Sequence, residues 1–169
     1  MAALFVRSRG TPMDSKCAHS FEELAKLIRE KREQVYYPGP HSSNERSEIE
    51  KRFDVTFPVD FRRFLGSYGS LRTENLAVLG LGERDQIGRS LSEMLLITRL
   101  RFPDFPKELV PIAHLGNTLL ACLNCDPSHP FFGCVSSVDI EHSNDLTKLT
   151  PCFSDFLYQH LVSLGTTFD

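Results

Sequence analysis

Residues 109–138 read LVPIAHLGNTLLACLNCDPSHPFFGCVSSV. The stretch contains three apolar runs, at 109–114, 117–124 and 132–138, and the first two are separated only by Leu115-Gly116. Each run has the length of a strand, and the first connection is too short to hold a helix. The stretch therefore predicts adjacent antiparallel strands in a meander. A further short strand is expected at 76–79, ahead of this stretch.

Helices are predicted on both sides of these strands. Three Ser/Glu pairs have the spacing of a capping box, in which each side chain accepts the other residue's backbone N–H. These pairs are Ser20 with Glu23, Ser42 with Glu45, and Ser90 with Glu93. The pairs predict a helix over 20–36, a second that begins at Ser42, and one that begins at Ser90 and ends before Phe102-Pro103.

Two more helices are predicted from proline starts. One begins at Pro58 and ends at Gly69, and the other opens at Thr150-Pro151 and closes at Gly165. The sequence shows no alternating βαβ pattern, which predicts an α+β fold with N-terminal helices, a central mainly antiparallel sheet and a C-terminal helix packed on the sheet. Residues 1–19 are expected to be a flexible lead-in, and 20–169 a single domain.

Aromatic residues repeat at helical spacing in the helix that begins at Pro58. The residues concerned are Phe61, Phe64 and Tyr68, together with Leu65. A stripe of this kind is either buried core or an exposed recognition surface, and core is the commoner use. We therefore expect Phe61 to pack against the sheet.

Composition narrows the class of protein. The chain has 169 residues, 41% of them apolar, and a net charge of −3, which suits one folded core and disfavours a general nucleic-acid binder. Charge is unevenly spread, with 13 Lys/Arg and 10 Asp/Glu in residues 1–72 but 6 and 12 in residues 73–169. No secretory signal or bilayer-spanning run is apparent, so a cytoplasmic protein is expected, acting without a membrane.

The five cysteines are odd in number and scattered, unlike a secreted disulfide framework, which favours a reducing cytosol. Cys122 and Cys125 have CxxC spacing, with His129 and Cys134 nearby. Side chains three apart on one strand point to opposite faces, so we expect no zinc site there. The βαβ context of a thioredoxin-type motif is also missing. No metal and no cofactor are expected.

No catalytic motif stands out. Gly80-Leu-Gly82 lacks the third glycine of a dinucleotide fingerprint, since Asp85 takes that position, and the chain has no GxSxG or HExxH sequence. A serine or cysteine nucleophile with distant partners stays open as an alternative. We expect the protein not to be an enzyme.

The order of three segments resembles the SUKH superfamily, which includes yeast cell-wall-synthesis regulators and bacterial immunity proteins. The three segments are EIEKRFDVTFPVDFRRFLGSYG at 48–69, LVPIAH with GNTLLACLN at 109–124, and FSDFL at 153–157. Four departures from the family pattern occur, at Asp54, at Phe57, at Asn124 and at the pair Cys152-Phe153, where Ser-Phe is typical.

The resemblance implies a non-enzymatic protein binder, most often an immunity protein that neutralises a toxin, or alternatively a regulatory scaffold of the cell-wall-regulator type. The partner is then a protein, such as a basic nuclease toxin, because residues 104–169 carry eight acidic residues and only two lysines. We place the partner-binding surface at Asp126, Asp139, Glu141 and Asp145, on a monomer or weak dimer.

Overall fold

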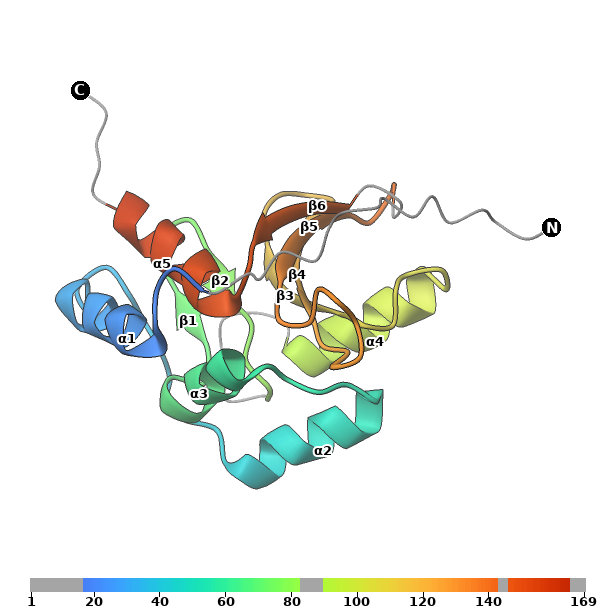
Figure 1. Cartoon of the computed structure of the whole chain (residues 1–169), viewed down its shortest axis with the longest axis horizontal. Coiled ribbons are helices and arrows are strands. Elements are labelled where there is room, and N and C mark those ends of the chain that lie inside the picture. Colours follow the sequence, from blue (N-terminus) through green and yellow to red (C-terminus); the bar gives the residue numbers. More distant parts are fainter. Residues whose placement is uncertain (1–16, 83–89, 143–145, 165–169) are drawn as a thin grey trace.

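The computed structural model describes residues 17–82, 90–142 and 146–164 (Figure 1). Within them it forms helices and strands in the order predicted for an α+β domain. The helices are α1 (Phe21–Glu30), α2 (Ser43–Phe53), α3 (Val59–Ser67), α4 (Leu91–Arg101) and α5 (Phe153–Ser163). The strands are β1 (Leu71–Arg72), β2 (Ala77–Val78), β3 (Leu109–His114), β4 (Leu119–Asn124), β5 (Val135–Asp139) and β6 (Leu146–Thr150).

The strands form one antiparallel sheet whose spatial order, β1-β2-β3-β4-β5-β6, is the order of the sequence. The predicted meander of the three central strands is therefore confirmed. The register shifts between Pro111 and Ala113 and again between Val135 and Ser136. Two strands, β1 and β6, had not been predicted. Thr150 ends β6, so the last helix begins at Phe153 instead of at Thr150-Pro151.

All three predicted capping boxes are present, with both reciprocal hydrogen bonds formed in each. The first helix is shorter than predicted and ends at Glu30, with Lys31 as its C-cap. The reason lies in the sheet, because Tyr36 exchanges both backbone hydrogen bonds with Arg72 and cannot remain helical. The predicted end of the last helix, Gly165, lies outside the described residues.

The core lies on both faces of the sheet. Residues 120–124 are buried without interruption, which requires cover on either side because alternate side chains of a strand face opposite ways. In Figure 1, α4 lies on one side of β3 and β4, and α1, α3 and α5 lie on the other. The expected packing of a C-terminal helix on an antiparallel sheet is confirmed.

The aromatic stripe of α3 is core. Phe61 and Phe64 are fully buried, and both rings lie 4.9 Å, centre to centre, from the ring of Phe153 on α5. The stripe therefore joins α3 to α5 and is not a recognition surface. No helix within the described ranges has the length and apolarity needed to cross a membrane.

Candidate protein-binding groove

Helix α4 carries apolar side chains around its whole circumference. Leu91, Met94 and Leu95 are buried, whereas Leu96 and Leu100 are 40% and 72% exposed. A helix at the surface of a soluble domain ordinarily keeps its apolar residues on one face. The outer side of α4 therefore offers more apolar surface than folding of this chain uses.

A groove of about 410 Å³ runs between α4 and the sheet. Its walls come from five separate parts of the chain. The lining residues are Ala77, Leu79, Met94, Ile97, Thr98, Arg101, Phe102, His114, Leu120 and Ile140. Apart from Arg101, His114 and Thr98 these are apolar side chains, a composition typical of sites that receive an apolar group and orient it with few polar contacts.

Strand register explains why these residues share one face. His114 of β3 lies opposite Leu120 of β4, and Leu120 lies opposite Val138 of β5. Side chains directly opposite each other point to the same side of an antiparallel sheet. Val138 in turn lies opposite Leu146 of β6, which is 48% exposed. Leu146 therefore points to the same side of the sheet as Leu120 on the groove floor, with the fully buried Val138 between them.

Two of the predicted binding residues, Asp139 and Glu141, lie at one end of this groove on either side of Ile140. Asp139 lies opposite Leu119, one residue away from the Leu120–Val138 pair, so its side chain faces away from the groove floor. It accepts hydrogen bonds from the Glu141 backbone N–H, at 3.0 Å, and contacts the His142 ring nitrogen at 3.3 Å. The first of these bonds is the main reason that the pKa of Asp139 is lowered. Asp139 therefore stays ionised at neutral pH and shapes the turn, while Glu141 is exposed.

The other two predicted residues are not part of the same surface. Asp126 follows β4 at Asn124, the opposite end of the strand from Leu119, which faces Asp139. Its carboxylate accepts bonds from the Ser128 hydroxyl and backbone N–H, which lower its pKa. Asp145 lies outside the described residues. The structure brings Asp139 and Glu141 together and separates Asp126 from them, and a role in binding stays a prediction for all four.

Cys122 and Cys125 are both buried, and burial raises the pKa of each thiol. A buried, protonated thiol is a poor nucleophile and a poor metal ligand. His129, the nearest candidate in sequence, is hydrogen bonded to Asn124 at 3.1 Å. The absence of bound metal at this CxxC pair stays a prediction.

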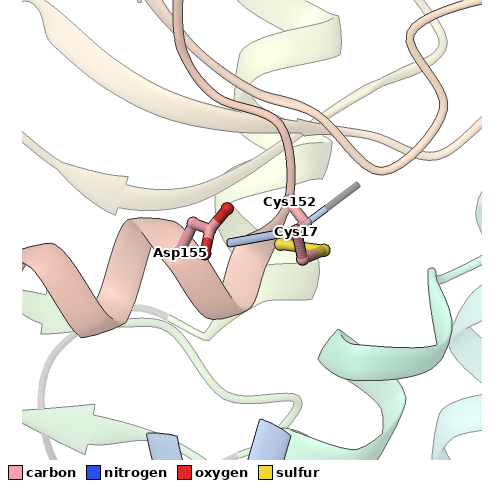
Figure 2. A group of neighbouring side chains, drawn as sticks. All are labelled: Cys17, Cys152 and Asp155. Atoms are coloured by element: carbon pink, nitrogen blue, oxygen red, sulfur yellow. A yellow bond between two sulfur atoms is a disulfide. The ribbon is translucent and has the colours of Figure 1, made fainter. Parts of the chain in front are cut away.

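Two other cysteines, Cys17 and Cys152, lie next to each other, a pairing that their positions in the sequence do not predict. They form a disulfide across a sequence separation of 135, beside Asp155 (Figure 2). Among the described residues these three make the one group of ligand-bearing side chains close enough together to hold a metal ion. Because the two sulfurs are bonded to each other, neither is a thiolate, the form in which cysteine binds a metal.

Fold and groove define an α+β domain built on one antiparallel meander, with an apolar groove beside a surface helix. Residues 40–159 match the model of the SMI1/KNR4 family (SUKH-1), and the chain belongs to this family. The resemblance inferred from the three segments is thereby confirmed, and the family is a generally non-catalytic one. No curated protein matches the chain. The family match begins at residue 40, so α1 and the residues before it lie outside the matched range.

Proposed function

We propose that this protein is an immunity protein that neutralises a toxin by direct, non-enzymatic binding, and that the groove beside α4 receives the partner. Membership of the SMI1/KNR4 family is consistent with an immunity or a regulatory role. The observation that carries the proposal is the groove itself, because its apolar lining, which includes the partly exposed Ile97, Phe102 and Ile140, is a surface that folding leaves open.

The chemistry of the groove indicates what the partner should present. An apolar side chain would fill the channel, and basic residues around it would face the exposed Glu141, next to Ile140 at one end of the groove. Residues 104–169 carry eight acidic residues against Lys107 and Lys148, which favours a basic partner over an acidic one. A nuclease toxin has this charge because it must bind nucleic acid.

Replacing Leu100 by glutamate should weaken binding by about tenfold or more, because it places a charge where the partner buries apolar surface. The free energy of unfolding should change by no more than about 0.5 kcal/mol, since Leu100 is 72% exposed. Isothermal titration calorimetry against the protein encoded by the adjacent gene provides the measurement.

Val59 provides a matched control, because it is also 72% exposed but lies at the start of α3, away from the groove. Val59→Glu should bind with the affinity of the unmodified protein. Equal affinity for both variants would show that the outer side of α4, next to the groove, takes no part in binding. Binding that leaves the partner's toxic activity intact would favour a regulatory scaffold over an immunity protein.

Charge at the end of the groove should act on the rate of association. Complementary charge raises association rates from about 10⁵–10⁶ M⁻¹s⁻¹ toward 10⁸ M⁻¹s⁻¹ at low salt. Glu141→Lys should therefore slow association and flatten its dependence on salt concentration, as followed by stopped-flow mixing. Glu141 is a cleaner target than Asp139, whose carboxylate also holds the turn.

The control for this change is Glu48→Lys, which makes the same charge reversal at an exposed position of α2. It alters net charge equally without altering the groove. If the two variants associate at the same rate at every salt concentration, the acidic end of the groove does not steer the partner.

A further inference from the structure

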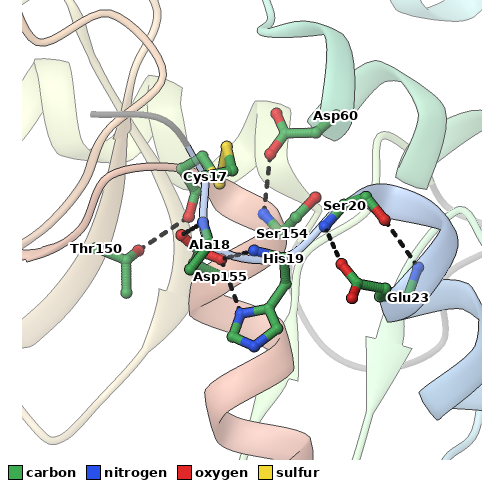
Figure 3. A network of polar contacts seen from close by, with 10 residues as sticks. Cys17, Ala18, His19, Ser20, Glu23, Asp60, Thr150, Ser154 and Asp155 are labelled. Carbon is green, nitrogen blue, oxygen red and sulfur yellow. Dashed lines mark hydrogen bonds and ion pairs between the residues drawn. A yellow bond between two sulfur atoms is a disulfide. The ribbon is translucent and has the colours of Figure 1, made fainter. Parts of the chain in front are cut away.

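The segment 17–20, here called the strap, lies against the first turn of α5. The backbone N–H groups of Ala18 and His19 donate to the two carboxylate oxygens of Asp155, at 2.9 and 2.8 Å, and the His19 ring nitrogen lies 3.0 Å from the same carboxylate (Figure 3). Asp155 is only 1% exposed. A buried carboxylate requires hydrogen-bond donors, so the strap both covers Asp155 and supplies donors to its carboxylate oxygens.

The surface beneath the strap is held firmly from the other side. Ser154 donates its backbone N–H to Asp60 of α3 at 2.9 Å, and the Thr150 hydroxyl donates to the Cys152 carbonyl at 2.9 Å. The His19 ring also stacks on Tyr158 of α5 at 3.8 Å between ring centres. Cys152 is thus a buried thiol position fixed by its neighbours, whereas Cys17, at the strap, is exposed.

The two cysteines are placed for a cross-link. Their Cα atoms lie 5.8 Å apart, a separation ordinary for a disulfide, and the structure joins their sulfurs. The other three cysteines, Cys122, Cys125 and Cys134, are buried in the core and remain free. Access therefore selects Cys17, the exposed member of the pair, as the thiol that an oxidant in solution meets first.

We propose that Cys17 and Cys152 form a site of reversible thiol–disulfide exchange that latches the strap onto α5. In the oxidising direction the Cys17 thiolate attacks a small-molecule disulfide such as oxidised glutathione, forming a mixed disulfide and releasing one thiol. The Cys152 thiolate then attacks the Cys17 sulfur and releases the second thiol. Two electrons pass from the cysteine pair to the small disulfide, and the two cysteine protons end on the released thiols.

The latch makes the cover of Asp155 dependent on redox conditions. When the disulfide is reduced, the Asp155 hydrogen bonds and the stacking of His19 on Tyr158 hold residues 17–19 in place, while Ser20 stays fixed as the N-cap of α1. The contacts of residues 17–19 can then open locally. When it is oxidised, Cys17 can no longer leave Cys152, and the strap amides stay paired. The strap precedes the family match at 40–159 while Cys152 lies within it, so the latch joins an added segment to the shared fold.

The test uses the full chain equilibrated over a range of reduced to oxidised glutathione and then quenched with an alkylating reagent. Peptide mass spectrometry should find a Cys17–Cys152 linkage, with the other three cysteines alkylated once the chain is unfolded. Hydrogen exchange at the amides of Ala18 and His19 should be at least about tenfold slower in the oxidised form. The Tm should rise by about 5 °C or more on oxidation, because the cross-link closes a long loop.

Two variants provide the comparison. Cys17→Ser removes the latch at an exposed position and should make exchange and Tm insensitive to the glutathione ratio. Cys134→Ser is the control and should keep the redox response. If this variant fails to fold, the reduced unmodified protein serves as the control instead. Linkage through a different cysteine, or equal amide exchange in both redox forms, would overturn the proposal. So would one zinc ion per chain that protects both thiols from alkylation, which would make the cluster a metal site.

Discussion

Phe61→Ala should lower the free energy of unfolding by about 3 to 5 kcal/mol, the range expected when a fully buried aromatic ring is removed and a cavity remains. The Phe61 ring has no exposed surface and lies 5.3 Å from the ring of Phe57 and 4.9 Å from that of Phe153. Its loss would remove one of the two ring contacts that join α3 to Phe153 of α5. The cavity should persist because three helical and loop segments surround it and cannot all collapse inward.

Denaturant unfolding followed by circular dichroism gives the change in midpoint and slope. Phe131→Ala is the control, since Phe131 is 36% exposed and lies in the loop between β4 and β5. Phe131→Ala should lower the free energy of unfolding clearly less than Phe61→Ala does. A midpoint for Phe61→Ala that matches that of the unmodified chain would contradict the burial of this ring.

Gly69→Ala should destabilise the fold by about 3 kcal/mol or more, because it combines backbone strain with a steric overlap. Gly69 has a φ of +77°, and a Cβ atom there would lie 2.0 Å from the carbonyl oxygen of Gly39. The loop cannot easily retreat, because the Gly39 N–H is hydrogen bonded to the Tyr68 carbonyl at 3.2 Å. The turn after α3 is thus built around the missing side chain.

Gly116→Ala is the matched control, since a Cβ atom at Gly116 would meet only the Leu119 Cβ, at 3.9 Å. The free energy of unfolding of this variant should lie within about 1 kcal/mol of that of the unmodified protein. Thermal and denaturant unfolding of the two variants side by side would decide the matter. Similar stability for both would mean that the 39–69 contact is not formed in solution.

Local sequence signals predicted most of the fold because their causes are local. A capping box such as Ser42 with Glu45 is complete within four residues, and the three central strands alternate with short connections, so neither needs knowledge of distant contacts. Strand β6 was missed for the opposite reason. Residues 146–149 are all exposed, so apolar patterning gives no sign of a strand that is held in the sheet by pairing with β5.

The groove could not be predicted because its lining comes from β2, α4, β3, β4 and the turn after β5. The sequence did show that the helix from Ser90 has apolar residues on its outer side, Leu96 and Leu100, but these do not line the groove. The four acidic residues were grouped by charge alone. Strand register separates Asp126 from Asp139 by the length of β4, which no count of charges can reveal.

The meander has a consequence for synthesis on the ribosome. Each strand from β2 to β6 pairs with the strand before it in the chain, so hairpins can form in the order in which they are made. Helix α5 comes last, yet Phe153, Leu157 and Leu161 are fully buried beside helices made much earlier. The nascent chain must therefore wait, with the aromatic face of α3 uncovered, until α5 has left the exit tunnel. A chaperone that binds exposed aromatic residues would find its target in that interval.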